Sequence, residues 1–277
     1  MGEMGTKAPL RWLATVVAAT TLGAVAVGAC SNDDNSNKAG STSTTAALTG
    51  TKAACQQWVK IDTAAGKGPG GSDEQPTPAQ GKAFASTLAG LFPKFVANAP
   101  SDIKDATTDI QSRLTAAQSS GDLSHLDPSS DETFAGELDK IETWVHDSCG
   151  FQNVDLVGVD YEFQGMPATL KAGPVSIVFT NKAKDEFHEV NVALVKPGVS
   201  VDDIMTAIRK NADQAQGKYQ GDLTFINNTG APPGGSSAIT LNLTKGTYLV
   251  TCFVPVGGKE GAPPHAQMGM MQKFTVS

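Results

Sequence analysis

Aromatic and charged residues are scarce in this chain, and clusters of basic residues are missing. Of its 277 residues, 6% are aromatic and 18% are charged, and the net charge is −7. An acidic chain with scattered Lys and Arg offers no surface suited to the phosphates of nucleic acid or to anionic lipid. We therefore expect no nucleic acid among the partners of this protein.

Signatures of catalysis are missing as well. No serine lies in a Gly-Xaa-Ser-Xaa-Gly context, and no phosphate-binding glycine loop is found. Histidine occurs only four times. Two of these, His125 and His146, have no second ligand type at metal-binding spacing, so we expect them at capping or surface positions. The sequence predicts a protein that is not an enzyme.

The N-terminus has the pattern of a targeting segment. Lys7 and Arg11 precede an uncharged run over 13–29, which has the length of a secretory apolar core and is short for a membrane span. The run ends in the letters VGAC, which resemble the bacterial lipobox: an apolar residue, two small residues and the lipidated cysteine. Residues 1–29 are therefore predicted to be a lipoprotein signal peptide, and Cys30 is predicted to carry the lipid.

The stretch that follows, residues 30–52, is rich in Ser, Asn, Gly, Thr and Ala. Because such a segment has little apolar surface to bury, we expect a disordered tether. The lipid would hold the protein to a membrane, at the extracytoplasmic face of a bacterial cell envelope. The alternatives are an ordinary signal peptide with a chance cysteine, or an uncleaved anchor.

The four cysteines are more informative than the charge. If Cys30 carries lipid, three remain in an oxidising compartment, and one of them is left over. Cys55 and Cys149 flank a single helical segment, so we expect a disulfide between them. Cys252 is then a free thiol, and it is either a functional residue or an inert buried cysteine.

Apolar residues recur at steps of three and four over residues 53–150, which predicts a small bundle of three or four helices. Pro100 breaks the pattern, and Ser101 and Asp102 offer the next helix start. One helix face is formed by Phe84, Leu88, Leu91, Phe92 and Phe95. This region shows no motif that indicates chemistry.

The apolar pattern changes to a period of two from residue 151 to residue 277. Short segments of this kind, separated by Gly, Pro and Asn turns, predict a β-sandwich or barrel. A helical insertion near 201–208 is expected to cover a sheet end. The chain is therefore predicted to be an α+β protein of two domains. The strand-like segments are 154–163, 175–180, 190–194, 238–243, 248–253 and 273–276.

Three segments of the second domain resemble the cupredoxins. The letters FTNKAKDEFHEV are similar to the cupredoxin segment in which a strand ends in Asn (here Asn181) and a loop delivers a histidine (here His188). The letters KGTYLVTC resemble the strand that ends on the copper-binding cysteine, and HAQMGMMQKFTV resembles the closing loop and last strand. The resemblance covers about 154–277 and implies a cupredoxin-like Greek-key β-sandwich.

The resemblance also implies a copper ligand set of His188, Cys252, His265 and Met270. A thiolate and two imidazoles in a trigonal plane, with a weak axial thioether, form a site that changes oxidation state with little rearrangement. Met268 competes with Met270 for the axial position.

Two further residues are expected to support this ligand set. Asn181 is expected to hydrogen-bond around the site and stiffen the loops that carry the ligands. Glu189 stands where the family commonly has Asn after the first histidine, and it adds an oxygen beside the site.

The spacing of Cys252 and His265 departs from the family pattern. Twelve residues, 253–264, lie between them, whereas the cupredoxins usually have only a few. This insert is rich in Gly and Pro. It either forms a hairpin that returns His265 to the site or relaxes the geometry of the ligands.

The predicted function is that of a membrane-anchored lipoprotein that binds copper for electron transfer or copper handling, with a redox or copper-delivery protein as partner. A stiff site favours electron transfer, and a loose, Met-rich one favours Cu(I). The alternative is a metal-free sandwich for partner recognition. Some bacterial metal-uptake proteins also join a helical domain to a cupredoxin-like one, but their His-Xaa-Xaa-Glu helical motif is missing from this sequence.

Overall fold

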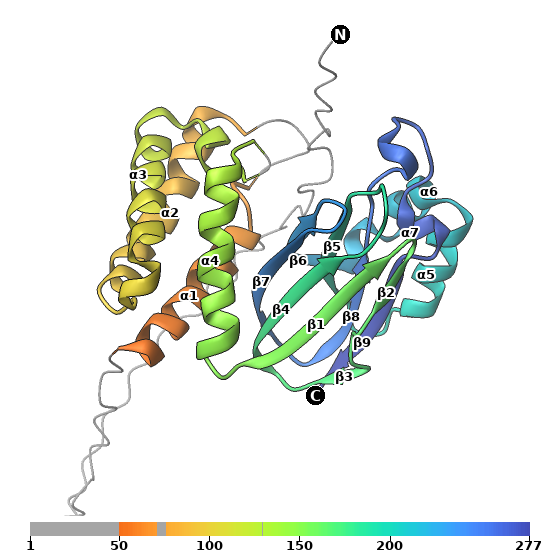
Figure 1. Ribbon diagram of the computed structural model, residues 1–277. Coiled ribbons are helices and arrows are strands. Elements are labelled where there is room, and N and C mark those ends of the chain that lie inside the picture. The colour runs from red at the N-terminus through yellow and green to blue at the C-terminus, as the bar shows by residue number, and fades with distance from the viewer. Residues whose placement is uncertain (1–49, 71–75, 129) are drawn as a thin grey trace, which may run out of the picture.

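The structure is a computed structural model that describes residues 50–70, 76–128 and 130–277 (Figure 1). The predicted signal peptide, the predicted lipidation site Cys30 and most of the predicted tether lie outside these residues. Among the described helices, none has the length and apolar character needed to cross a bilayer.

Four α-helices form the N-terminal bundle: α1 (Thr51–Gly66), α2 (Pro78–Val96), α3 (Lys104–Ser120) and α4 (Glu132–Ser148). Thr77 and Gln80 form a reciprocal capping box at the start of α2, and Asp131 caps α4. The predicted disulfide is confirmed, since Cys55 in α1 is bonded to Cys149 directly after α4. Short 3-10 turns, η1 (Ser101–Ile103) and η2 (Leu123–Leu126), flank α3. The buried core includes Trp58, Phe92, Phe95, Leu114 and Ile141.

Two β-sheets form the C-terminal sandwich, with their inner faces packed on one apolar core. The first sheet has the order β2-β1-β4-β7, and the second has the order β3-β9-β8-β5-β6. Strands β1 and β4 pair in parallel, as do β3 and β9, and the other pairs are antiparallel. The predicted architecture, a helical bundle followed by a β-sandwich, is confirmed. The strands are β1 (Gln152–Val159), β2 (Glu162–Gln164), β3 (Thr169–Leu170), β4 (Gly173–Asn181), β5 (His188–Val195), β6 (Leu223–Ala231), β7 (Ser236–Leu243), β8 (Gly246–Thr251) and β9 (Met271–Val276).

Two details of the strand prediction were wrong. The single strand expected over 154–163 is two strands, β1 and β2, because the chain turns at Asp160, which has a positive φ of 43°. Strand β6 was not expected, and its side chains are mostly half-buried rather than alternating between buried and exposed.

Helices also cover the outer face of the five-stranded sheet. The insertion forms α5 (Val201–Lys210) and α6 (Ala212–Tyr219), followed by the turn η3 (Gln220–Asp222). These helices lie on the opposite side of the sandwich from the bundle (Figure 1). Their apolar side chains share a core with Leu249 of β8 and Met271 of β9. The insertion was expected at the end of a sheet, and instead it covers a sheet face.

The bundle contacts the outer face of β4 and β7 through α1 and α4, and α1 also packs along β6. This interface is held by polar side chains. Buried Glu142 accepts a hydrogen bond from Trp58 Nε1 at 2.8 Å and another from Thr240 Oγ1 at 2.6 Å. Asp62 accepts a bond from the backbone N–H of Thr240 at 2.9 Å. The Asp62 carboxylate on α1 therefore satisfies a backbone N–H at the free edge of β7. An unpaired N–H at a sheet edge could otherwise pair with a strand of another molecule.

His146 belongs to the same interface. Its Nδ1 lies 3.0 Å from Ser176 Oγ on β4, across the boundary between the bundle and the sandwich. The sequence predicts a capping or surface position for this residue. The structure assigns it a contact between the two parts of the chain.

The buried position of Glu142 predicts how stability depends on pH. Burial raises the pKa of Glu142 from its ordinary value of 4.5 to about 7, and bonds from Thr240 and Trp58 oppose this shift. Burial also raises the pKa of the neighbouring Asp62. Because the folded state favours the protonated carboxyl groups, their contribution to stability is present below the unfolded pKa and is lost as the pH rises through 7.

We therefore expect Glu142→Gln to flatten the fall in the free energy of unfolding between about pH 5 and pH 8, as measured by urea denaturation. Glu132→Gln, at the exposed start of the same helix, is the matched control and should keep the wild-type slope. An unchanged slope in Glu142→Gln would contradict the assignment.

Candidate metal centre

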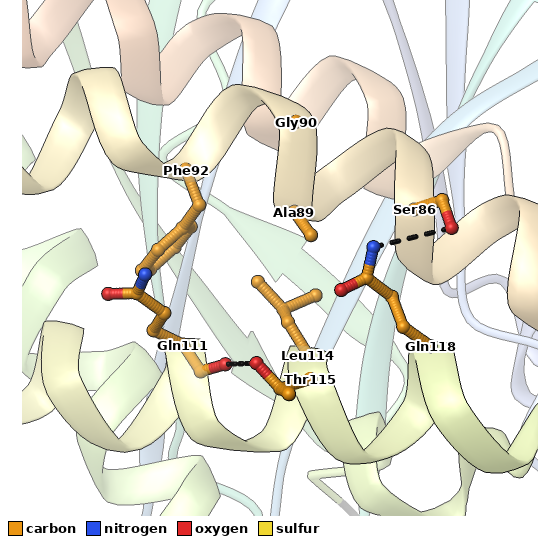
Figure 2. A pocket seen from close by; sticks show the side chains of 8 residues that line it. All are labelled: Ser86, Ala89, Gly90, Phe92, Gln111, Leu114, Thr115 and Gln118. Carbon is orange, nitrogen blue, oxygen red and sulfur yellow. Dashed lines mark hydrogen bonds between the residues drawn. The ribbon is translucent and has the colours of Figure 1, made fainter.

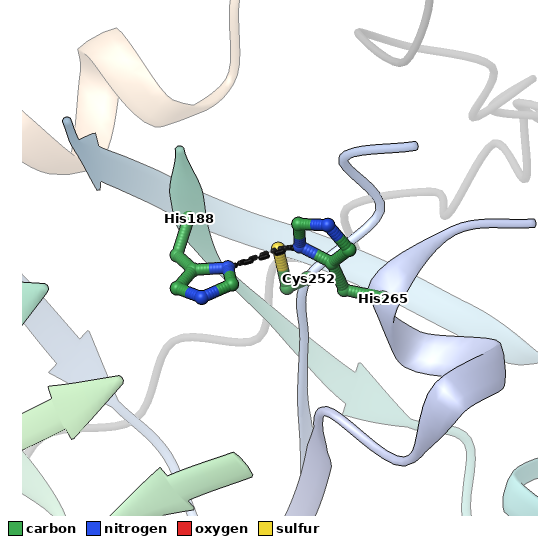
Figure 3. A group of neighbouring side chains, drawn as sticks. All are labelled: His188, Cys252 and His265. Carbon is green, nitrogen blue, oxygen red and sulfur yellow. Dashed lines mark hydrogen bonds between the residues drawn. The ribbon is translucent and has the colours of Figure 1, made fainter. Parts of the chain in front are cut away.

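Three of the predicted ligands meet at one end of the sandwich. His188 is the first residue of β5, Cys252 directly follows β8, and His265 begins the short helix α7 (His265–Met268). All three are fully buried. Figure 3 shows the two imidazole rings turned toward the Cys252 sulfur from different elements. They are the group of His, Cys, Asp and Glu side chains, among the described residues, that could hold a metal ion.

The distances between the three donor atoms fit a metal ion. The two Nδ1 atoms lie 2.9 Å apart, and Cys252 Sγ lies 3.3 Å from His265 Nδ1 and 3.9 Å from His188 Nδ1. A point in the plane of this triangle lies about 2 Å from each donor, close to the roughly 2.0–2.3 Å of zinc–nitrogen and zinc–sulfur bonds. The donor set of two imidazoles and one thiolate therefore fits a metal without movement of the backbone.

Backbone hydrogen bonds fix the loops that carry the donors. The N–H of Cys252 donates to the carbonyl of Met270 at 3.1 Å, and the N–H of Ala266 donates to the carbonyl of Cys252 at 2.7 Å. The N–H of His265 donates to the carbonyl of Val254 at 2.9 Å. Because bonds run in both directions between the two loops, Cys252 and His265 are held at a fixed separation.

Burial controls the protonation of the donors. It lowers the pKa of His188 to about 4, with a smaller contribution from His265, and it also lowers the pKa of His265. Burial raises the pKa of the Cys252 thiol. Near pH 7 the imidazoles are therefore neutral and able to bind a metal, whereas the thiol must lose its proton when a metal binds.

The two candidate axial methionines occupy different environments. Met270 is fully buried in the sandwich core, which also contains Cys252 and Phe179. The methyl group of Met270 lies close to Gly158: a Cβ added at Gly158 would be 3.1 Å from this methyl carbon. Met268 is 53% exposed. Of the two, only Met270 packs in the same core as the donor cysteine.

Asn181 ties together the segments around His188. Its Nδ2 donates to the carbonyls of Glu186 and Ala231, at 2.8 Å and 2.9 Å. Its Oδ1 accepts from the N–H of Ala183 at 2.9 Å. The side chain is fully buried, so it links the loop before β5 to the end of β6 without help from solvent.

Glu189 contacts the site through its backbone. Its N–H donates to Cys252 Sγ at 3.4 Å. Its carboxylate instead accepts from Asn191 Nδ2 at 2.7 Å and from the N–H of Phe253 at 3.0 Å. The oxygen expected beside the metal is therefore engaged with the segment that follows Cys252.

A carboxylate that the sequence did not single out contacts the site. Glu186 Oε2 lies 3.1 Å from Nε2 of His265, on the side of the ring away from the donors. The same carboxylate accepts from the hydroxyl of Tyr161 at 3.2 Å and from the N–H of Gly257 at 3.1 Å. Glu186 precedes His188 by two residues, and this spacing gives no signal of a contact with His265.

The insert between Cys252 and His265 forms a hairpin. Pro255 and Pro264 form a bridge, and the N–H of Val256 donates to the carbonyl of Pro263 at 3.0 Å. The 3-10 turn η4 (Val256–Gly258) lies within it. Of the two expectations for the insert, the structure shows the hairpin that returns His265 to the site.

Two grooves on the bundle lie apart from these donors. One, of about 280 Å³, runs between α2 and α3, where Gln118 reaches across to Ser86 (Figure 2). The other, of about 510 Å³, is bordered by Asp102, Asp139 and Asp147 among others. None of the three donor residues lines either groove.

Comparison with known proteins gives structural matches alone. No protein-family model matches the chain, and no curated protein matches it. Auracyanin from Roseiflexus castenholzii is 20% identical, with a TM-score of 0.32, over 46% of this chain and 97% of its own. Auracyanin A from Chloroflexus aurantiacus, described as a blue copper protein, is 21% identical, with a TM-score of 0.31, over 46% and 100%. Rusticyanin from Thiobacillus ferrooxidans is 20% identical, with a TM-score of 0.28, over 46% and 79%.

The strand order and the buried donors, rather than these scores, define the C-terminal part of the chain. It is a β-sandwich of two mixed sheets with a His-Cys-His group that could hold a metal.

The contacts of Asn181 predict a large effect on stability. Asn181→Ala would leave two buried carbonyls and one N–H without a partner, so we expect a loss of roughly 2–4 kcal/mol in the free energy of unfolding. Asn153→Ala, which removes one bond from an exposed side chain, is the control and should cost under about 1 kcal/mol. Urea denaturation of both variants measures the difference, and similar losses would argue against a linking role for Asn181.

Proposed function

We propose that this protein is a membrane-anchored, extracytoplasmic lipoprotein whose cupredoxin-like sandwich binds copper and carries electrons. The convergence of His188 Nδ1, His265 Nδ1 and Cys252 Sγ in one buried triangle is the observation that carries the proposal. Met270 is the proposed axial ligand. Bound copper would supply a one-electron couple, and a thiolate with two imidazoles and a weak axial thioether is the donor set that suits it.

The rigidity of the site supports electron transfer over copper delivery. All three donors are fully buried, and backbone bonds connect the loops of Cys252 and His265. A site held in this way changes little between oxidation states. Delivery would favour mobile sulfur ligands at the surface, and of the three methionines near the C-terminus, Met268 alone is exposed.

The proposed partner is a redox protein, and we propose no substrate turnover. Phe187 and Met268 are the exposed large hydrophobic residues among the described part of the chain, 44% and 53% exposed. Each lies close in sequence to one of the two histidine donors. We propose that the redox partner contacts the protein near these two side chains.

The cell-envelope location rests on the cysteines. A disulfide between Cys55 and Cys149 is typical of proteins from an oxidising compartment. The proposed lipid on Cys30 would keep the protein at the membrane surface. The competing function is a metal-free recognition module, for which the buried, unpaired thiol of Cys252 would be a packing residue alone.

Copper titration of the soluble chain without its signal peptide tests the metal proposal. We expect one copper per chain and a strong thiolate-to-copper absorption band in the visible range. Cys252→Ser should abolish the band, because serine cannot supply the thiolate sulfur. Met268→Leu, a change at the exposed methionine, is the control and should leave the band unchanged.

Three other results of this titration would redirect the interpretation. Tight, colourless Cu(I) binding that depends on Met270 would indicate copper delivery. Preferential binding of zinc would point to a structural metal. Failure to bind copper in either oxidation state would leave the recognition module.

The lipid anchor is tested separately, on the full precursor expressed in a lipoprotein-processing bacterium. We expect the wild-type chain to incorporate a labelled fatty acid and to sediment with membranes. Cys30→Ala should lose both properties, because it removes the lipidated thiol. Cys252→Ala is the matched control and should stay labelled. Fatty-acid labelling that persists in Cys30→Ala would refute this anchor.

A further inference from the structure

We propose that Glu186 is the positioning residue of the metal centre, holding His265 in place through Nε2 and fastening the insert 253–264 over that histidine. The inference rests on the proposed function, since its consequence for a metal requires that copper binds. The contacts of the carboxylate belong to the protein alone and can be tested without metal.

The backbone delivers Glu186 to this position. It lies in the loop between β4 and β5, and its carbonyl accepts a bond from Asn181 Nδ2 at 2.8 Å. Asn181 is fully buried and ends β4, so the loop is fastened at the level of Glu186. The Glu186 side chain is 21% exposed and extends from this anchor to His265.

The contact with Glu186 selects the tautomer of His265. A carboxylate is only an acceptor when ionised, so Nε2 of His265 carries the proton that it donates. Nδ1 of the neutral ring then presents its lone pair toward Cys252 Sγ and His188 Nδ1. Histidines that bind metals commonly donate their second N–H to a carboxylate, which fixes both the tautomer and the ring orientation.

His188 provides an internal comparison. Its Nε2 is buried and has no hydrogen-bond partner of normal geometry among the described residues. Its ring is placed by the start of β5 instead. The carboxylate contact is therefore specific to His265, the donor that follows the long insert.

The insert is attached to the same carboxylate. The N–H of Gly257 lies 3.1 Å from both carboxylate oxygens, and Gly257 reaches this position with a positive φ of 65°. The Tyr161 hydroxyl also donates to Glu186, and the Tyr161 ring centre lies 5.0 Å from that of His265. One carboxylate thus joins the β1–β2 turn, the insert and the donor histidine, which explains how a twelve-residue insert coexists with a fully buried His265.

The first measurement uses the metal-free chain. Correlation of ring ¹⁵N and ¹H shifts should show His265 in wild type as one tautomer with the proton on Nε2. Glu186→Ala should give a mixture of tautomers. Glu186→Gln, whose side-chain carbonyl still accepts a hydrogen bond, should retain the wild-type tautomer. Asp185→Asn removes the same charge from an exposed neighbour and should have no effect on the ring.

The second measurement uses the copper-loaded chain. Competition with a chelator should show copper affinity weakened about 10- to 100-fold in Glu186→Ala, the usual effect of losing such a contact, with no change in Asp185→Asn. Glu186→Gln should raise the reduction potential more than Asp185→Asn does, because it removes a negative charge that lies against a ligand.

These outcomes separate the two proposals. If wild type takes up no copper, the proposed function fails, while the tautomer of His265 still tests Glu186. If Glu186→Ala keeps a single Nε2–H tautomer in a folded chain, Glu186 does not position His265 and the inference is overturned. If Glu186→Ala does not fold, the reduction potentials of copper-loaded Glu186→Gln and Asp185→Asn provide the test. Equal reduction potentials in these two variants would overturn the inference.

Discussion

The antiparallel pairing of β5 with β8 fixes the place where the donors meet. The pair ends at Asn191 opposite Thr251, so His188 and Cys252 leave their strands at the same end of the sheet. Strand β9 pairs with the other edge of β8, with Met271 opposite Thr251, and this brings the segment from His265 to Met270 beside Cys252. A register slip of one residue would turn the side chains of β8 to the opposite face. The position of the donors is thus a consequence of the sheet core.

The sandwich is covered by helices on both outer faces, and the two covers differ in chemistry. Helices α5 and α6 bury an apolar surface against β8 and β9. The bundle contacts β4 and β7 through Glu142, Asp62 and His146, whose partners on the strands are Thr240 and Ser176. Polar contacts in a buried interface cost stability when any partner is missing, so they favour one docking arrangement over others. The bundle therefore has a defined position against the sandwich.

Much of the fold could be predicted from the sequence, because most elements follow a simple apolar period. Phe84, Leu88 and Phe95 repeat at helical spacing and lie on one helix, and β4, β7 and β8 alternate or are continuously apolar. Strand β6 could not be found in this way, since it contains Asn227, Asn228 and Gly230. It is partly covered by α1, where Gly66 lies against the backbone of Ile226. Because this contact joins residues that are far apart in the sequence, the local apolar pattern of β6 does not predict it.

The candidate site also contains some residues that a sequence pattern predicts and others that it does not. His188, Cys252, His265 and Asn181 stand in segments whose letters resemble a family pattern, and the structure brings these residues together. Glu186 and Tyr161 are not part of that pattern, although Glu186 lies within one of the segments. Glu186 stands 79 positions before His265 in the sequence and meets it only when the chain has folded into a hairpin and a sheet. Glu189 shows the limit of a pattern. It occupies a familiar position after His188, yet its carboxylate binds Asn191 and Phe253.

The long insert explains why rigidity and accessibility must be considered separately at this site. A histidine at the end of a short loop is held by the loop itself, whereas twelve residues of Gly- and Pro-rich chain provide little restraint of their own. Here the restraint comes from the bridge between Pro255 and Pro264 and from the bond of Gly257 to Glu186. The same contacts close the outer edge of His265, which is fully buried. The structure therefore combines a fixed donor geometry with a covered histidine. In the proposed function, electrons would have to cross the insert or an adjacent surface rather than an exposed imidazole edge.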